Sequence, residues 1–535
     1  MDDSLVSLAL GGTISILVAM AARYRGIGTP IPLLLSGVAL GLLPFGWGIS
    51  SDPEVVLIAL LAPLVFGEAM QLAYVDLRRV GKAVAALAIG LVVFGAFIIG
   101  IAAALVVPAM PFAVALALGG ILGPTDAVAV SAAARRAGLP SRLLAILEGE
   151  SLVNDGTALT FLRVTLVAAS AGAVTAGETL LILGQSVLGG MVIGALGGAA
   201  VRWVLRTDHD AIATNGLILV LPFPLYLTAE AVGGSGILAV VTAALIVSHA
   251  VTKYGDHTVR LYSGSVWNQI TFVLQSVAFF LIGLELPSSV RELPAEDAGD
   301  LVVLVAALLA AMIAARFVWL YGMAVVARIR GIAMRPGGLG YGKSWIVAAW
   351  AGARGPISGL AAFSLPLTLD NGDPFPYRDL VIAATLCSVV VTVLLGPSLQ
   401  AVAHWVGVEP DDDESLMQEI RLALAEAAQL RLNHVLWESD HDGVTYPDTA
   451  VRGVQAEATA AVQRASLAVE SGARDDTAIL RAVAADDAAE SLRWEMLNAE
   501  QDALRLARDE GRITESLMRA LQRELDVRKA HRDNP

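Results

Sequence analysis

The stretch Glu-Gly-Glu-Ser-Leu-Val-Asn-Asp at residues 148–155 decides the class of this protein. It lies inside an apolar segment, residues 142–169, that is long enough to cross a membrane. An ionised side chain at the centre of a bilayer costs about 2.5–3.5 kcal/mol on insertion scales, and acids at that depth bind ions or relay protons. A further acid, Asp126, follows a Gly-Pro pair in the preceding apolar segment. Together the two segments predict a cation pathway.

The composition of the chain changes sharply near residue 410. Residues 1–410 carry 21 Lys and Arg against 24 Asp and Glu, whereas residues 411–535 carry 15 against 26. The whole chain is 56% hydrophobic and 16% charged, where a soluble protein has about 25% charged residues. We therefore expect a nearly neutral transmembrane domain at 1–410 and an acidic helical tail at 411–535. The tail is either a regulatory domain or a plain helical support.

Several function classes are disfavoured by what the chain lacks. The acidic tail argues against nucleic acid as a partner, because nucleic-acid binding needs a basic face. The one cysteine, Cys387, leaves no internal disulfide, and no His or Cys cluster or glycine-rich phosphate loop stands out. We expect no cofactor and no enzyme activity. The first residues lack a positive charge, so the first apolar segment is expected to be a retained span rather than a signal peptide.

The sequence contains thirteen apolar segments that could cross a bilayer, which takes about 20 residues each. They are residues 5–22, 30–44, 54–74, 82–107, 112–134, 142–169, 179–202, 212–231, 235–251, 266–286, 301–327, 345–366 and 379–404. The second is short, and Gly or Pro interrupts the fifth, the eighth and the twelfth.

The positive charges fall on alternate loops between these segments. One set of loops holds sixteen Lys and Arg, and the other set holds only Arg291 and Arg378. Positively charged loops stay in the cytoplasm, so we expect the N-terminus outside and the tail inside. The tail itself is expected to form helices at about 413–439, 448–471 and 476–529.

Two of the interrupted segments point to an internal repeat. The fifth contains Gly-Pro-Thr-Asp at 123–126, and the twelfth contains Gly-Ala-Arg-Gly-Pro at 352–356. They are seven segments apart, as in two inverted six-helix units joined by one linker helix. The expected fold is an all-α polytopic membrane protein with about 13 transmembrane helices, whose broken helices cross near the midplane. Coincidence stays open, because Gly and Pro are common in membrane helices.

The oxygen atoms around Asp126 and Asp155 are ligands that suit a hard cation such as Na⁺. Asp155 lies in mid-segment, and Ser151 shares its helix face because residues four apart align. Asp126 follows a proline that frees backbone carbonyls, that of Thr125 among them. The side-chain amide of Asn154 can both donate and accept hydrogen bonds, so it is suited to hold the interrupted backbone of the neighbouring segment. These residues form the predicted ion site.

Three basic residues lie within the apolar segments: Arg163, Arg316 and Arg354. Buried charges are usually paired. Glu150 is an available partner for Arg316, and we interpret that pair as structural, with a transport role as the alternative. Arg354, at the second break, can offset the dipole ends of two half-helices. Arg163 has no partner that the sequence identifies.

The motifs at residues 123–130, 147–156 and 352–355 resemble those of the monovalent cation/proton antiporters of the sodium/proton exchanger type. The resemblance covers about residues 5–405. The bacterial branch with a helical cytoplasmic tail is the most similar. The resemblance implies a homodimer in the bacterial plasma membrane with a dimerisation domain and a mobile core. It implies elevator-like alternating access, exchange of one sodium ion for one proton and a part in pH homeostasis.

The resemblance also assigns roles to individual residues. It makes Asp155 the cation- and proton-binding acid, with Asp126, Thr125 and Ser151 as coordinating groups. Asn154 bridges to the interrupted segment. The order Asn154-Asp155, with a single aspartate, is the electroneutral version of the motif.

The resemblance gives Glu150 and Arg316 a supporting part. It places Glu68 among the ion-coordinating residues, although the position of this acid departs from the family pattern. Glu150 and Arg316 match the structural ion pair of the family. Many members carry an acid in the third span that here is shifted by one residue to Glu68. Either that helix is locally rewound or Glu68 points elsewhere.

Competition for one carboxylate is the expected mechanism. Burial disfavours the charged form of a carboxylate, and a nearby cation favours it. A site that crosses the membrane only when neutralised couples the two ion fluxes. The open alternatives are a proton-coupled solute symporter, a K⁺/H⁺ antiporter, an ion channel, and a receptor or scaffold that signals through its tail.

Overall fold

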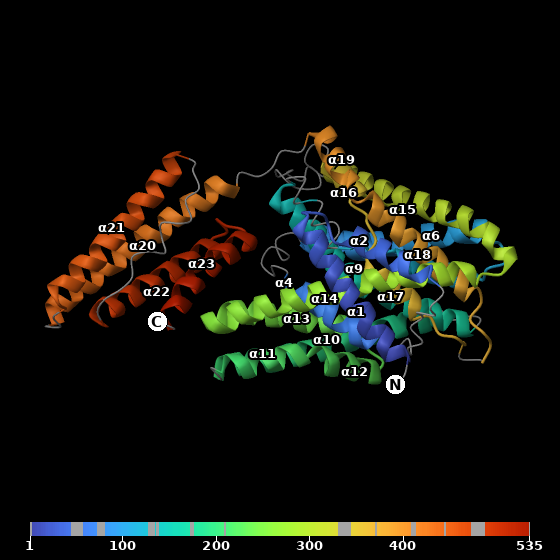
Figure 1. Cartoon of the computed structure of the whole chain (residues 1–535), viewed down its shortest axis with the longest axis horizontal. Coiled ribbons are helices and arrows are strands. Elements are labelled where there is room, and N and C mark those ends of the chain that lie inside the picture. The colour runs from blue at the N-terminus through green and yellow to red at the C-terminus, as the bar shows by residue number, and fades with distance from the viewer. Residues whose placement is uncertain are drawn as a thin grey trace. The chain divides into compact units, whose positions relative to one another are not determined.

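The computed structural model of the chain describes residues 3–43, 57–71, 81–126, 134, 139–171, 176–207, 210–329, 344–369, 372–407, 413–442, 446–471 and 487–533. Within these residues the secondary structure is helical, and an isolated β-bridge joins Thr368 to Pro374. The expected all-helical class is therefore confirmed (Figure 1).

The helices of the N-terminal 410 residues are α1 (Asp3–Tyr24), α2 (Pro30–Gly41), η1 (Leu57–Leu61), α4 (Ala62–Gln71), η2 (Ala86–Leu91), α6 (Val92–Val106), α7 (Phe112–Leu122), α9 (Ser141–Ala171), α10 (Ala176–Thr207), α11 (Ala211–Val220), α12 (Pro222–Ala231), α13 (Gly236–Tyr254), α14 (His257–Arg291), α15 (Ala295–Ile329), α16 (Ser344–Trp350), α17 (Pro356–Phe363), α18 (Arg378–Leu395) and α19 (Ser398–Val406). Those of the tail are α20 (Asp413–Asp442), α21 (Asp448–Ser471), α22 (Asp487–Asp509) and α23 (Glu515–Asp533).

Many of these helices are apolar enough to lie in a membrane. In the described part of the chain, eight helical stretches are long and apolar enough to cross a bilayer, and four shorter apolar helices accompany them. The eight include Leu143–Ala169, which carries the acidic stretch, and the four include Phe112–Leu122. The number of thirteen spans stays a prediction.

Proline and glycine end helices where the sequence indicates. α7 ends at Leu122, and the residues up to Asp126 are not helical. α16 ends at Trp350, residues 351–355 are not helical, and α17 begins at Pro356. Proline lacks a backbone N–H and is best tolerated at the first turn of a helix, which explains where α17 begins.

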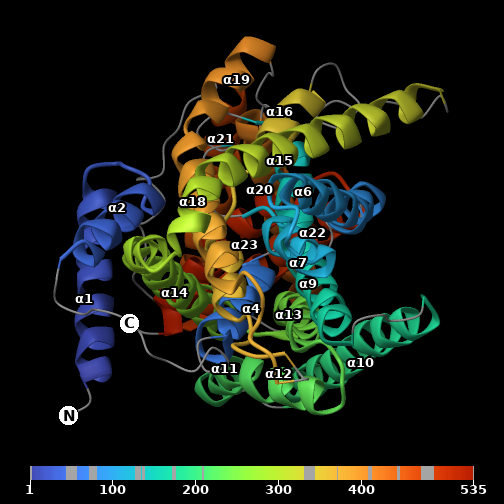
Figure 2. The same ribbon diagram turned by 90° about the vertical axis from the view of Figure 1, so that its right-hand side faces the viewer.

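Small residues let the helices approach one another closely. Gly37 of α2 lies against the backbone of α14 at Phe280 and Gly283, and Gly283 lies against the backbone of α2 at Leu34. Membrane helices use such residues because their association depends on close packing. In Figure 2, α6, α7 and α9 lie side by side in the part of the bundle that carries the acids.

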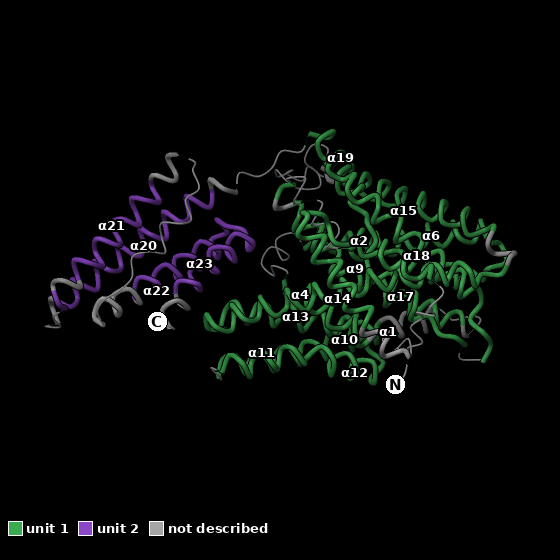
Figure 3. The backbone as a smooth tube through the Cα atoms, viewed as in Figure 1, with its two compact units in different colours: residues 1–410 green, residues 411–535 purple. Residues whose placement is uncertain are grey.

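The chain divides into two compact units, Met1–Pro410 and Asp411–Pro535 (Figure 3). In the second unit, apolar side chains of α20, α22 and α23 form a buried cluster that includes Leu424, Leu504 and Leu521. The expectation of one long helix at 476–529 is wrong. α22 and α23 are separate, and Gly511 between them has φ +76°, a left-handed conformation that glycine adopts without strain.

Candidate functional site

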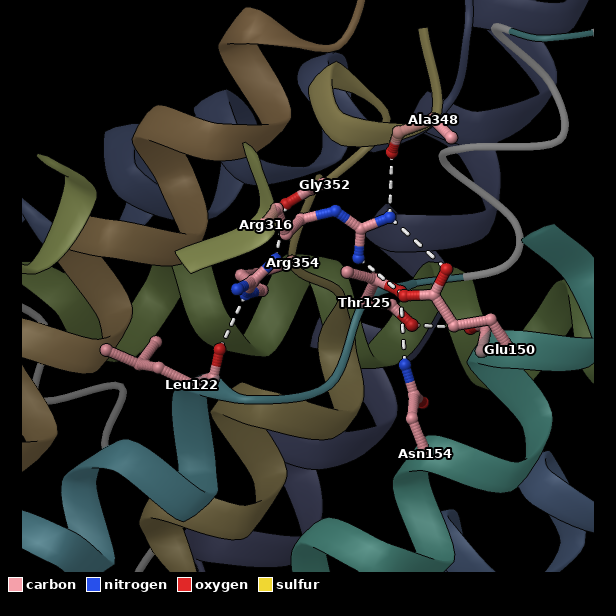
Figure 4. Close-up of polar contacts among 9 residues, drawn as sticks. Leu122, Thr125, Glu150, Asn154, Arg316, Ala348, Gly352 and Arg354 are labelled. Carbon is pink, nitrogen blue, oxygen red and sulfur yellow. Dashed lines mark hydrogen bonds and ion pairs between the residues drawn. The ribbon is translucent and has the colours of Figure 1, made fainter. Parts of the chain in front are cut away.

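The two helix breaks meet each other. The backbone N–H of Asp126 donates to the carbonyl of Ala353 at 2.9 Å. Arg354 reaches back from the second break, where its Nε donates to the Leu122 carbonyl and its Nη1 to the Gly352 carbonyl, both at 2.6 Å. Figure 4 shows the Arg354 side chain directed at Leu122. Both carbonyls lie at or just beyond helix C-termini, so the guanidinium offsets the negative ends of two half-helices.

Two glycines of the second break leave room for charged side chains. A Cβ atom on Gly355 would overlap Cβ and Cγ of Asp126. A Cβ atom on Gly352 would lie 2.9 Å from Cδ of Arg316. The Gly-x-Arg-Gly motif thus packs one glycine against the acid of the first break and the other against the buried arginine.

Helix α9 binds the first break through a row of polar side chains. The Ser151 hydroxyl donates to the carbonyl of Thr125. The Asn154 amide donates to Thr125 Oγ1 at 3.1 Å, and that hydroxyl donates to Glu150 Oε1 at 3.3 Å. All four residues are buried. The non-helical backbone at Thr125 is therefore hydrogen-bonded to other protein groups, as irregular backbone inside a membrane must be.

Glu150 and Arg316 form a buried, two-pronged ion pair. Nη1 of Arg316 donates to Glu150 Oε1 at 2.5 Å, and Nη2 donates to Oε2 at 3.2 Å and to the Ala348 carbonyl at 2.9 Å (Figure 4). The Arg316 and Glu150 side chains are only 4% and 2% exposed. Removing one partner of such a pair would leave an uncompensated buried charge, which agrees with a structural interpretation.

Asp155 occupies the interior without a cationic partner among the described residues. It is 2% exposed, and its Oδ2 atom is buried with no hydrogen-bond partner in this part of the chain. The charges of Glu68 and Asp126 both act on it, and those two acids also act on each other. Buried polar groups in proteins are nearly always paired. A buried carboxylate oxygen that lacks a partner, and on which the charges of two other acids act, is suited to hold a proton or a cation.

Comparison with known proteins agrees with this geometry. The family model described as sodium/hydrogen exchanger, transmembrane, matches residues 9–405. The chain belongs to the sodium/hydrogen exchanger family. It is 31% identical to an uncharacterized Na⁺/H⁺ exchanger of Mycobacterium tuberculosis over 536 residues, covering 99% of this chain and 96% of that protein. It is 30% identical to a sodium, potassium, lithium and rubidium/H⁺ antiporter of Bacillus subtilis over 393 residues, covering 69% and 58%.

A solved structure has the same fold as this exchanger. The sodium proton antiporter of Methanocaldococcus jannaschii, at pH 8, superimposes with a TM-score of 0.60 and 18% identity. The match covers 75% of this chain and 98% of that one. At this identity the likeness concerns the fold alone.

Glu68 of the exchanger lies among the acids although its position in the motif is shifted. It is 8% exposed and accepts a hydrogen bond of 3.0 Å from Gln275 Nε2 of α14. The π-helical turn η1, Leu57–Leu61, directly precedes the helix that carries Glu68. A π turn accommodates one extra residue and rotates the helix beyond it. That this turn compensates the one-residue shift of Glu68 stays a prediction.

Sequence reasoning missed two contacts made by polar residues of the apolar segments. Gln275 is one of them, although an amide within the apolar part of α14 is the kind of residue that marks a polar path. Arg163 pairs with Glu230 of α12 at 3.0 Å and also donates to the Gly234 carbonyl at 3.0 Å. Glu230 comes directly after an apolar stretch near the end of its segment, so the hydropathy pattern did not mark it as a partner.

Proposed function

We propose that this protein is a secondary active antiporter that exchanges Na⁺, or another monovalent cation, for H⁺. One observation carries the proposal. The buried carboxylate of Asp155 has an oxygen without a hydrogen-bond partner among the described residues, and the charges of Glu68 and Asp126 act on it. Membership of the sodium/hydrogen exchanger family and the names of the relatives support the same activity.

Electrostatics provides the coupling. Unit charges of one sign repel strongly in a medium of low dielectric constant, so the three acids favour an occupant with positive charge. A proton on Asp155 and a metal cation beside it both supply that charge, and one excludes the other. The cation would lie among oxygen atoms of Asp155, Asp126, Thr125 and Ser151, the ligands that hard cations prefer. The same site then carries either Na⁺ or H⁺ across the membrane, one ion at a time.

The proposed movement is elevator-like. The hydrogen bonds between the two breaks and α9 join α7, α9 and α16 at the ion site. We assign these helices to a mobile core, and assign α12 and α13 to a dimerisation domain in a homodimer. Asn154 is neutral and followed by a single aspartate, so each cycle exchanges one cation for one proton. The tail lies in the cytoplasm in this proposal, and the N-terminus lies outside.

Substitution of the central acid tests the proposal. Asp155→Asn keeps the size of the side chain and removes the competition, so reconstituted protein should lose sodium-driven proton movement into or out of proteoliposomes. Asp300→Asn, a substitution at an exposed acid of α15, is the control and should exchange normally. Sodium-dependent pH change that persists in the well-folded Asp155→Asn variant contradicts the assignment.

Exchange of potassium for protons is a second candidate, because the name of the Bacillus subtilis relative includes that cation. The same proteoliposomes, given sodium, lithium or potassium salts in turn, rank the cations. The sign of the pH change separates antiport from proton-coupled symport, since only antiport moves protons against the direction of the cation.

A further inference from the structure

Three cationic side chains gather around one tyrosine where α10 and α13 end. Arg202 and Arg206 extend from the last turns of α10, and Lys253 precedes Tyr254 at the end of α13. The tyrosine hydroxyl accepts hydrogen bonds from Nη2 of Arg206 at 2.6 Å and of Arg202 at 3.3 Å. The three cations lie 4.3–5.5 Å from the centre of the ring. We call these four residues the Tyr254 cluster.

No carboxylate neutralises the cluster within the described residues. Arg202, Arg206 and Lys253 form no ion pair with an acid in that part of the chain. Two acids of the adjoining turns are used as helix caps. Asp210 accepts from the backbone of α11 at 2.9 and 3.1 Å, and Asp256 accepts from the backbone of α14 at 2.7 Å.

Within the described residues, the positive charge of the cluster is only partly offset. Like charges that share one small region repel. The C-terminal dipoles of α10 and α13 offset part of this charge, and the electron-rich ring contributes a modest attraction to each cation. Neither supplies a full negative charge. The three cations are exposed, so an external anion can reach all of them.

The surroundings of the cluster are those of a lipid interface. Trp203 lies between the two arginines in the sequence and is 67% exposed, as tryptophans at the headgroup level of a membrane are. Toward the middle of α10, Leu188, Val192 and Leu196 are 65%, 55% and 64% exposed and recur every four residues. They form an apolar stripe on one face of the helix. The stripe runs along α10 toward the basic end.

We propose that the Tyr254 cluster binds the phosphate of an anionic phospholipid in the cytoplasmic leaflet. The two guanidiniums and the ammonium would contact the headgroup, and the acyl chains would lie along the stripe of α10. The excess of Lys and Arg on this set of loops predicts the cytoplasmic side. Basic pockets between membrane helices on that side bind anionic headgroups. The stripe favours a lipid over a free phosphate ion, which has no apolar part to bury.

Lipid retention by the intact protein tests this proposal. Full-length protein in detergent is mixed with equal amounts of phosphatidylglycerol and phosphatidylcholine, and the bound lipids are counted by native mass spectrometry. The wild type should retain phosphatidylglycerol preferentially. Arg202→Gln combined with Arg206→Gln should weaken that binding by roughly thirtyfold, because each basic residue near the membrane surface contributes about fivefold. Lys253→Gln, on the other helix, should weaken it less.

The control removes two exposed arginines from another loop on the same predicted side. Arg23→Gln combined with Arg25→Gln changes the net charge equally and should leave the preference intact. Equal retention by the wild type and the Arg202/Arg206 variant, with both well folded, overturns the proposal. Displacement of the lipid by millimolar glycerol phosphate overturns the choice of a lipid, since a headgroup without chains should compete poorly.

Discussion

Gly355 lies directly against the side chain of Asp126, so the second helix break sets the position of the acid that the first break carries. The backbone of Asp126 is also bonded to Ala353, two residues before that glycine. The two breaks therefore act as one structural unit, and the ion site depends on residues that are more than 220 positions apart in the sequence.

Adding a methyl group at Gly355 should disturb the site without removing any charge. In Gly355→Ala the new Cβ must push Asp126 away, because the overlapping atoms lie next to the backbone. We expect the apparent affinity for sodium to fall by tenfold or more, which is about 1.4 kcal/mol. Gly95→Ala is the control, since a Cβ there meets nothing within 4 Å. Exchange assays across sodium concentrations give the apparent affinity of each variant. Equal affinities in the two variants would contradict the packing argument.

Breaking the buried ion pair should cost stability. Glu150→Gln leaves Arg316 charged and unpaired in the interior, so the free energy of unfolding should fall by about 3–5 kcal/mol. Thermal unfolding in detergent measures the loss. Arg163→Gln breaks a pair whose side chains are 36% and 37% exposed, and its cost should stay below about 1 kcal/mol.

The double variant Glu150→Gln, Arg316→Gln separates a structural role from a transport role. Removing both charges should restore part of the stability lost in Glu150→Gln, because no bare charge remains. Exchange should return in step with stability. A stable double variant that is inactive would assign the pair to transport instead.

Neutralising Glu68 should weaken cation binding without abolishing exchange. Its charge acts on Asp155 and Asp126 across the site, so Glu68→Gln removes part of the field that attracts a cation. The expected loss in apparent sodium affinity is on the order of tenfold. Glu285→Gln, on α14, removes a charge elsewhere and should leave the affinity unchanged. Normal affinity in Glu68→Gln would show that its charge does not reach the bound ion.

Joining α9 to α12 should stop the cycle if the core moves. Nη1 of Arg163 and Oε2 of Glu230 lie 3.0 Å apart, so cysteines at both positions can be bridged by a short bis-thiosulfonate reagent, which joins each thiol through a reducible disulfide. The native cysteine, Cys387, is first replaced by serine. We expect exchange to stop in the bridged Arg163→Cys, Glu230→Cys variant and to return after reduction. Undiminished exchange with the bridge complete would exclude relative movement of these two helices.

The sequence was informative wherever polar chemistry interrupts an apolar pattern. Both helix breaks occur at the Gly-Pro positions that the sequence singled out, at residues 123–126 and 352–356. Asp126, Asp155 and Glu68 act on one another in the structure, and Glu150 is paired with Arg316. Such features are visible in a sequence because charge inside a membrane is costly enough to be rare.

The remaining features depend on contacts between distant helices. Nothing local to Gly355 predicts that Asp126 fills the space beside it, and nothing local to Arg163 identifies Glu230. The π turn at Leu57–Leu61 lies in an unbroken apolar run, where hydropathy carries no information on the number of residues per turn. The division between α22 and α23 depends on one glycine, Gly511, within a stretch of good helix formers.

Asn154 is neutral and its amide is engaged with Thr125, which leaves Asp155 as the single acid at this point of α9. In the proposed cycle one positive charge replaces another there. The electric field across the bilayer then does no net work on a complete turnover. A cell with a depolarised membrane could still extrude sodium through this protein for as long as its acid gradient lasted.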